Sequence, residues 1–377
     1  MADKRKGRKV APVKLSKGVI LTDTFKVSWS IMEPIGAGGF GVIYSVKKQG
    51  STESTTYAAK VEPHGNGPLF VEKNFFIRFL KPELIEDWKK KMKLSFLGLP
   101  KYMGSGTHVT NNVDHRFLIM ERFGDPISSR LKGAGESIDL KLLTTFCSQI
   151  IDSLMYIHEK GYAHMDIKPE NLLLKYNSKN DQVYLIDFGI IDKYTTDPVF
   201  KPDKKKQHNG TLLYCSRDSH SGVGTMRGDL EILGYNILAW CGYEFPWSKC
   251  LKTPAVVHQK KIDLMSDLDS LKNRVPTNIV NYLKYVNQLR HDETPDYERA
   301  KSVLRSVSTD SGTPKRRKRN ATNDEVLFDS SNGDPIQSVD VKLPRTRSRN
   351  IPDENDITSK ISKNIRGKGR SASSKMK

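Results

Sequence analysis

Apolar and polar positions follow two different patterns along this chain, one typical of strands and one typical of helices. Short runs rich in β-branched and aromatic residues predict strands in its first third, at residues 42–46, 57–61 and 116–120. Between residues 140 and 160, apolar residues recur three or four positions apart, which predicts an amphipathic helix ended by Gly161. The same spacing predicts further helices at residues 69–80, at 278–289 and just before residue 306.

A predicted hairpin in the middle of the chain brings three chemically active side chains together. Its strands are residues 172–174 and 182–186, with turn-forming residues between them. Because a hairpin holds its outer ends side by side, Asp166, Asn171 and Asp187 should converge on one small volume. Phosphoryl transfer requires such a cluster, since a carboxylate orients the hydroxyl and oxygen ligands hold Mg²⁺. Taken singly, each residue could instead be a turn former or a solvated charge.

Three glycines, Gly36, Gly38 and Gly41, form G-x-G-x-x-G, a spacing that phosphate-binding turns of several folds share. In a dinucleotide-binding fold this turn opens a helix, whereas here the β-branched and aromatic residues 42–46 follow. The sequence therefore predicts a strand–turn–strand flap whose glycines let backbone N–H groups approach phosphates.

Lys60 lies in a short apolar strand, where an unpaired ammonium group is costly to bury. Its expected partner is Glu72, because helical spacing places this carboxylate on the same face as apolar side chains in the helix predicted at residues 69–80. A glutamate near the start of a helix is also favoured by the helix dipole alone, and this alternative stays open.

Charge is distributed unevenly over the 377 residues, a length that suits two domains or one bilobal domain with tails. The formal net charge is +19. Residues 1–20 carry seven Lys or Arg against one Asp, and residues 313–377 carry sixteen against eight acidic residues, so the part between them is nearly neutral at +5. Basic ends on a near-neutral middle predict an enzyme-like body with arms that bind polyanions.

The four cysteines, Cys147, Cys215, Cys241 and Cys250, show no C-x-x-C pair and no metal-ligand spacing, which predicts reduced thiols in a cytosolic or nuclear protein. The charged N-terminus has no apolar stretch behind it, so we do not expect a signal peptide. The longest apolar stretch, residues 230–245, is too short to span a bilayer, and no membrane span is expected.

Two motifs in order, H-x-D-x-K-x-x-N at residues 164–171 and D-F-G at residues 187–189, resemble the catalytic loop and metal-binding motif of eukaryotic protein kinases. Lys168, two positions after the aspartate, resembles the serine/threonine branch. Phe40 and Val42 extend the resemblance to the glycine-rich loop of these kinases.

The resemblance implies a role for each residue of the cluster. Asp166 would orient the acceptor hydroxyl and accept its proton, and Lys168 would stabilise the transferred phosphoryl group. Asn171 and Asp187 would hold Mg²⁺, and Met120 would be the gatekeeper. The residues implied to surround ATP are Ile35, Gly36, Ala37, Gly38, Gly39, Phe40, Gly41, Val42, Ile43, Ala58, Lys60, Glu72, Met120, Glu121, Phe123 and Leu173.

The segment after residue 209 departs from the usual kinase pattern. No Ala-Pro-Glu closes the expected activation loop, residues 192–216; instead the chain reads R-G-D-L-E at residues 227–231 and F-P-W at residues 245–247. This arrangement resembles the casein kinase one group and, within it, the vaccinia-related kinases. In that family Asp229 would anchor the catalytic loop. A plain helix N-cap is the simpler interpretation of an aspartate at this place, and the two roles are compatible.

Two further features bear on regulation and substrate choice. Met165 stands where many kinases carry an arginine that pairs with a phosphorylated activation loop, which predicts activity without such a switch. Four lysines of the loop could simply be solvated or could favour acidic or phosphorylated substrates; they are Lys201, Lys204, Lys205 and Lys206.

The resemblance covers about residues 21–306 and implies an α+β, bilobal protein kinase fold, with an antiparallel sheet and one helix in the N-lobe and a mostly helical C-lobe. The expected boundaries are a basic arm at 1–20, the N-lobe at about 21–120, the hinge at 121–124, the C-lobe at 125–306 and a disordered basic tail at 307–377. The implied function is ATP- and Mg²⁺-dependent phosphorylation of serine or threonine in nuclear, chromatin-associated proteins, such as barrier-to-autointegration factor and histone tails, around mitosis. We expect a monomer.

Basic clusters at residues 314–319, 344–349 and 363–370 predict nuclear import and contact with DNA or an acidic nucleosome surface. A merely solubilising tail is the alternative. Two other functions stay open: a pseudokinase-like scaffold that binds chromatin through its tails, and a kinase of small molecules.

Overall fold

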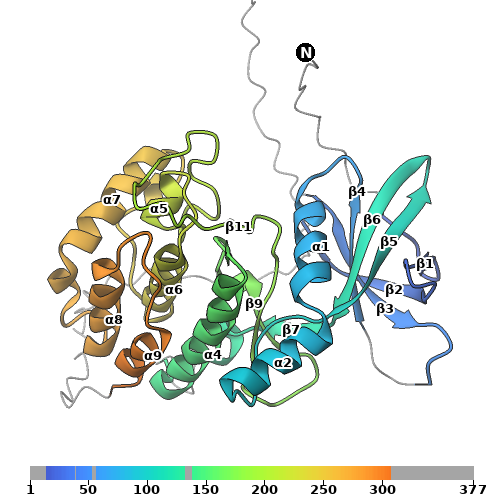
Figure 1. Cartoon of the computed structure of the whole chain (residues 1–377), viewed down its shortest axis with the longest axis horizontal. Helices are drawn as coiled ribbons and strands as arrows, with labels where there is room; N and C mark the ends of the chain where they lie inside the picture. The colour runs from blue at the N-terminus through green and yellow to red at the C-terminus, as the bar shows by residue number, and fades with distance from the viewer. Residues whose placement is uncertain (1–13, 39, 53–56, 132–137, 307–377) are drawn as a thin grey trace, which may run out of the picture. The chain divides into compact units, whose positions relative to one another are not determined.

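The structure, a computed structural model, describes residues 14–38, 40–52, 57–131 and 138–306. Its N-terminal part is a six-stranded antiparallel sheet with the strand order β1-β2-β3-β4-β6-β5 (Figure 1). The strands are β1 (Ile20–Thr22), β2 (Ser28–Ala37), β3 (Val42–Lys48), β4 (Tyr57–Pro63), β5 (Tyr102–Thr110) and β6 (Val113–Glu121). The three strands predicted for the first third of the chain are confirmed. Alternate residues of β2 and β3 form a small core that includes Trp29, Ile31, Tyr44 and Val46.

Two helices connect β4 to β5, namely α1 (Pro68–Phe79) and α2 (Pro82–Met92). Each begins with a proline, which suits the first helical position because its missing N–H has no partner there. The first confirms the helix predicted at residues 69–80. The second buries only Ile85 and Trp88, so most of its surface faces solvent.

The C-terminal part is mostly helical. Its helices are α3 (Ser128–Leu131), α4 (Leu140–Glu159), α5 (Arg217–His220), α6 (Met226–Trp240), α7 (Pro254–Ser266), α8 (Thr277–Gln288) and α9 (Tyr297–Arg305), with 3₁₀ turns η1 (Pro169–Asn171), η2 (Ser248–Cys250) and η3 (Leu268–Leu271). α4 ends at Glu159, Lys160 is its C-cap, and Gly161 follows with φ +84°, as predicted. α6 is buried along most of its length, because its apolar side chains point in every direction. Within the described ranges, no helix is both long and apolar enough to cross a membrane.

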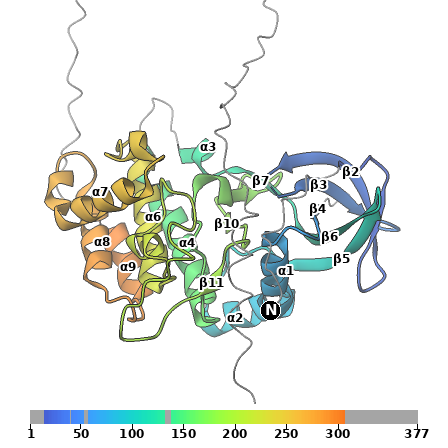
Figure 2. The ribbon, with the colours of Figure 1, turned by 90° about the horizontal axis from the view of Figure 1, so that it is seen from above.

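Short strands lie between the large sheet and the helices α4 to α9, as both views show (Figures 1 and 2). The predicted hairpin is confirmed: β9 (Leu172–Lys175) pairs antiparallel with β10 (Val183–Leu185). β7 (Phe123–Pro126) pairs with β9, and β8 (Tyr162–Ala163) pairs with β11 (Asp192–Lys193). The α+β arrangement of a sheet followed by helices is therefore confirmed.

The kinase domain was expected to start at residue 21, but the described fold begins earlier in the chain. Leu15 is buried, and its N–H donates to the Tyr44 hydroxyl at 2.8 Å. Part of the expected basic arm thus belongs to the described fold, since Leu15 packs on the sheet and the carbonyl of Val19 accepts the N–H of Ile31 at 2.9 Å. The remainder of that arm and the expected tail, residues 1–13 and 307–377, lie outside the described residues. All four cysteines are described, and all are free thiols.

Candidate active site

The catalytic loop, residues 164–171, joins β8 to β9 and is held by the side chain of Asp229 on α6. This carboxylate, 1% exposed, accepts hydrogen bonds from the backbone N–H groups of His164 at 2.7 Å and Met165 at 2.8 Å. It also lies 2.9 Å from Nε2 of His158 on α4. Three buried polar contacts on one carboxylate fix the start of the loop relative to two helices.

The simpler interpretation of Asp229 as a helix N-cap is wrong. Thr225 caps α6, because its hydroxyl accepts the N–H of Gly228 at 2.9 Å, and Asp229 lies four residues after this cap, in the first turn of the helix. Asn236, which the sequence did not single out, lies two helical turns after Asp229 and donates from Nδ2 to the carbonyl of Ile167 at 2.9 Å. Its signal was a polar residue seven positions after Asp229, on the same face of a mostly apolar helix.

Met165, which stands at the expected arginine position, is buried and adopts φ +69°. This left-handed conformation costs a non-glycine residue about 1–2 kcal/mol. The hydrogen bond from its N–H to Asp229 opposes that cost. The inference that activity needs no loop phosphorylation stays a prediction.

Asp166 lies between a cation and a hydroxyl. Its Oδ2 accepts from Nζ of Lys168 at 2.6 Å, and its Oδ1 accepts from the hydroxyl of Thr211 at 2.7 Å. Asn171 donates from Nδ2 to the Asp166 carbonyl at 2.9 Å. The structure thus brings together the predicted Asp166, Lys168 and Asn171, and adds Thr211, which follows the glycine at residue 210 and was not singled out from the sequence.

Lys60 on β4 joins the N-terminal sheet to the second acidic residue of the cluster. Its ammonium group lies 2.7 Å from Oε2 of Glu72 and 3.0 Å from Oδ1 of Asp187. Burial works against the ammonium, but the two carboxylates outweigh it and raise the pKa of Lys60. Burial likewise opposes ionisation of Asp187, yet the neighbouring Lys60 holds the pKa of Asp187 below its ordinary value. Both groups therefore stay charged at neutral pH, and the predicted Lys60–Glu72 pair is confirmed.

Phe188, next to Asp187, holds the Glu72 and Asp187 side chains in place beside Lys60. Its ring stacks on Phe75 of α1 with a centroid distance of 5.0 Å and meets His164 edge-on at 5.1 Å. Its backbone N–H donates to Oε1 of Glu72 at 3.2 Å. Both oxygens of Glu72 are thus occupied, which satisfies a carboxylate that α1 buries.

The glycine-rich flap connects β2 to β3, with Ala37 opposite Val42 and Gly36 opposite Ile43. The strand–turn–strand prediction is confirmed. A side chain at Gly41 would overlap the carbonyl oxygen of Val61, so only glycine fits this turn. Nothing lies within 4 Å of the position that a Cβ at Gly38 would take.

The remaining flap residues lie as follows. The N–H of Gly38 donates to the carbonyl of Gly41 at 2.9 Å, and the carbonyl of Phe40 accepts from Asn66 at 2.9 Å. Ile35 is 37% exposed. Gly39 lies outside the described residues.

The expected hinge residues lie where β6 passes into β7. Ala58 and Met120 face each other across β4 and β6, and both are buried. Glu121 ends β6, and Phe123 begins β7. Leu173 is half-buried on β9, the strand that pairs with β7. The five residues therefore gather at the junction of the sheet and the helical part.

The donor groups of the cluster suit the ATP and Mg²⁺ that the family resemblance implies. Mg²⁺ prefers oxygen ligands and usually takes only one or two from the protein. The Asp187 side chain is 39% exposed. Asn171 uses its Nδ2 on the loop backbone, which leaves its side-chain oxygen for a ligand. The Lys60 ammonium suits a phosphate oxygen.

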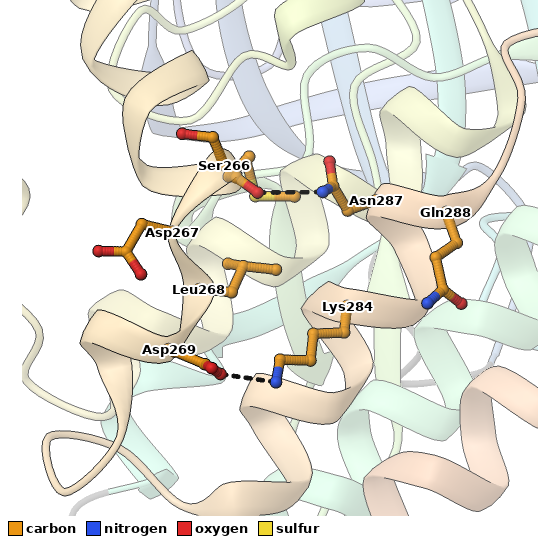
Figure 3. A pocket seen from close by; sticks show the side chains of 8 residues that line it. Ser266, Asp267, Leu268, Asp269, Lys284, Asn287 and Gln288 are labelled. Atoms are coloured by element: carbon orange, nitrogen blue, oxygen red, sulfur yellow. Dashed lines mark hydrogen bonds and ion pairs between the residues drawn. The ribbon is translucent and has the colours of Figure 1, made fainter.

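Two hollows in the described part of the chain are lined by residues other than those of this cluster. One, of about 260 Å³, is bounded by α7, η3 and α8 (Figure 3). There Lys284 pairs with Asp269 at 2.7 Å. The other, of about 530 Å³, lies at the end of the expected activation loop; its lining includes Leu213, Tyr214, Tyr243 and Phe245. Neither hollow contains a residue expected from the sequence to bind ATP or Mg²⁺.

The four activation-loop lysines are exposed. Lys201 pairs with Asp197, and Lys206 pairs with Asp192. Neither interpretation of these lysines, solvation or a preference for acidic substrates, is decided by these pairs.

Comparison with known proteins gives one family match and many similar proteins, of which three are described. A model described as protein kinase domain matches residues 101–219. The nucleosomal histone kinase 1 of Drosophila melanogaster is 41% identical over 304 residues, which cover 78% of this chain and 50% of that protein. The B1 kinase of vaccinia virus (strain Ankara) is 34% identical over 298 residues, which cover 76% of this chain and 97% of that protein.

Among solved structures, that of vaccinia related kinase 3 superposes with a TM-score of 0.68 at 26% identity, over 78% of this chain and 91% of that chain. The chain described here thus spans half the length of the Drosophila protein and nearly the whole length of the viral one.

Proposed function

The chain belongs to the vaccinia-related family of serine/threonine protein kinases, and from this premise we propose that it transfers the γ-phosphate of ATP to serine or threonine of nuclear, chromatin-associated proteins. The observation that supports the proposal is the pairing of Lys60 with both Glu72 and Asp187, while Asp166 holds Lys168. Three carboxylates and two ammonium groups, contributed by distant parts of the chain, take part in these contacts.

In this proposal each group has one task. Asp166 orients the acceptor hydroxyl and takes its proton, and Lys168 stabilises charge on the phosphoryl group. Lys60, fixed by Glu72, holds the α- and β-phosphates under the flap of residues 35–43. Asn171 and Asp187 hold Mg²⁺, which when bound neutralises charge on the phosphates.

The catalytic part of the proposal is tested with Lys60→Met and Asp187→Ala. Both variants should lose more than about 99% of phosphate transfer, because the first removes the cation proposed to hold the phosphates and the second removes a proposed ligand of Mg²⁺. The measurement is ³²P incorporation into the protein itself and into histone, with Mg-ATP. Lys90→Met on α2, an exposed lysine, is the matched control and should keep full activity.

Circular dichroism and a melting curve show whether the variants stay folded. A folded Lys60→Met variant that retained turnover would refute the role of Lys60. A wild-type protein that binds nucleotide without transferring phosphate would point instead to a scaffold that binds chromatin through its tails.

The chromatin part of the proposal rests on charge and on one relative. The Drosophila relative is named a nucleosomal histone kinase, and the basic residues of this chain concentrate at its ends. By family resemblance, the substrates are the N-terminal Ser/Thr of barrier-to-autointegration factor and histone tails, with control of chromatin–envelope attachment around mitosis as the consequence. The basic clusters would hold the enzyme on DNA phosphates or on an acidic nucleosome surface and direct it to the nucleus.

Removal of residues 309–377 tests this part. The truncated protein should bind nucleosomes more weakly and with a shallower salt dependence, because fewer basic side chains then neutralise DNA phosphates and fewer counterions are released. Its activity on a short peptide should be unchanged. If nucleosome binding and nuclear retention both survived the truncation, the tail would have no such role.

A further inference from the structure

Lys261 on α7 is a fully buried cation, 0% exposed. None of the ion pairs among the described residues includes it, although an unpaired buried charge is costly. The nearby carboxylate of Glu231 is occupied by Arg217 at 3.0 Å and by the Tyr235 hydroxyl at 2.8 Å. Lys261 therefore does not serve as one half of a salt bridge.

Backbone carbonyls and aromatic faces compensate this ammonium group instead. Its Nζ donates to the carbonyl of Leu212 at 2.9 Å and to the carbonyl of Cys215 at 2.6 Å. It also lies over the rings of Tyr235 at 5.3 Å and Trp247 at 5.5 Å. Two carbonyls three residues apart can meet one ammonium only in a tight turn, so this charge selects one conformation of residues 212–215.

The same turn is fixed by two further contacts. The indole N–H of Trp247 donates to the carbonyl of Leu213 at 3.0 Å. The carbonyl of Thr211 accepts the N–H groups of Tyr214 and Cys215, both at 2.8 Å. Side chains from residues 247–261 therefore occupy the carbonyls of residues 212, 213 and 215.

The turn of residues 212–215 lies between Asp166, which is proposed to orient the acceptor hydroxyl, and the larger hollow. Thr211 precedes it and donates its hydroxyl to Asp166 at 2.7 Å. Leu213 and Tyr214, which belong to it, line the hollow of about 530 Å³. If Asp166 takes the proton of the acceptor hydroxyl, as proposed, this turn adjoins the acceptor rather than ATP, because it follows directly on Thr211.

We propose that Lys261, together with Trp247, is a positioning residue for the protein acceptor, since it fixes the turn of residues 212–215 beside Asp166. This inference rests on the proposed kinase function and adds the element that sets acceptor binding. The ammonium group touches neither Asp166 nor any residue expected to bind ATP, and its effect passes through the turn alone.

The test is Lys261→Met, which keeps the length of the side chain and removes the charge. The KM for histone should rise at least about tenfold, since a shift of about 1 Å near the reacting groups has effects of this size or larger. The KM for ATP and the rise in melting temperature on adding Mg-ATP should stay within about twofold of wild type, because Lys60 and Asp187 are untouched. Lys260→Met, the adjacent position on α7, is the matched control and should leave both KM values unchanged.

The outcomes separate the two proposals. Wild-type protein without phosphate transfer would refute the kinase function itself. Active wild type with a folded Lys261→Met variant of normal histone KM would refute only the role of Lys261, and so would an equal rise of both KM values, which indicates general loss of structure. If Lys261→Met does not fold, Trp247→Phe is the second test. It keeps an aromatic ring near the Lys261 ammonium and removes the N–H that donates to the Leu213 carbonyl, so the KM for histone should still rise selectively. An unchanged KM for histone would refute the proposal.

Discussion

Replacement of Asp229 by asparagine should disable the catalytic loop while the fold persists. The side chains have the same shape, but asparagine has one acceptor oxygen where aspartate has two. In the structure one oxygen accepts from His164 N–H at 2.7 Å and faces His158, and the other accepts from Met165 N–H at 2.8 Å. Whichever way the amide is turned, its NH₂ group faces a backbone N–H donor.

The magnitude follows from these contacts. One hydrogen bond to a charged acceptor is lost, about 1.5–3 kcal/mol, and a buried N–H is left without a partner, about 1–3 kcal/mol. Met165 would in addition be free to leave its left-handed conformation and to move the loop with it. We expect a loss of about 3–5 kcal/mol in the free energy of unfolding, and a fall of about 100-fold in kcat because Asp166 is displaced.

The assays are urea unfolding at pH 7.5 and steady-state phosphorylation of histone. Asp87→Asn, an exposed aspartate on α2, is the control and should change stability by less than about 0.5 kcal/mol. A variant Asp229→Asn within about 1 kcal/mol and threefold of wild type would refute the anchoring argument, since a residue that merely fills space tolerates an isosteric amide.

Three further predictions concern other parts of the structure. Gly98→Ala should destabilise the protein by about 3 kcal/mol in urea unfolding, because its Cβ would overlap the carbonyl oxygen of Val183, whereas Gly67→Ala has nothing within 4 Å and should be tolerated. Glu72→Gln should lower kcat/KM for ATP about 10- to 100-fold with little loss of fold, because Lys60 loses one of its two carboxylates; equal kinetics would contradict the pairing. The free energy of unfolding should fall by up to about 1 kcal/mol per pH unit below pH 6.5, because burial lowers the pKa of His220 to about 2 and only the unfolded chain binds that proton. This loss should be smaller in His220→Gln, and an unaltered pH profile in that variant would exclude His220 as its source.

Local patterns in the sequence determined the elements of the site. The hairpin of β9 and β10, the flap between β2 and β3, and the helix α4 each follow from residues within about twenty positions of one another. The pairing of Lys60 with Glu72 also followed from the sequence, because a charge in an apolar strand and a charge on an apolar helix face each require a partner. These features could be predicted because the energy that fixes them acts over short sequence distances or has few possible partners.

The tertiary structure alone decided which polar residues support the site. From the sequence Asp229 could be an N-cap, an anchor of the catalytic loop or both, and only its contacts with a loop 65 positions away decide. Lys261 follows another lysine in a helix of mixed character and gives no local sign that its ammonium lies under a turn 46 positions earlier in the chain. Hydrogen bonds between such distant residues leave no periodicity in the sequence, because the energy that selects them arises only when the packed helices exclude water from both partners.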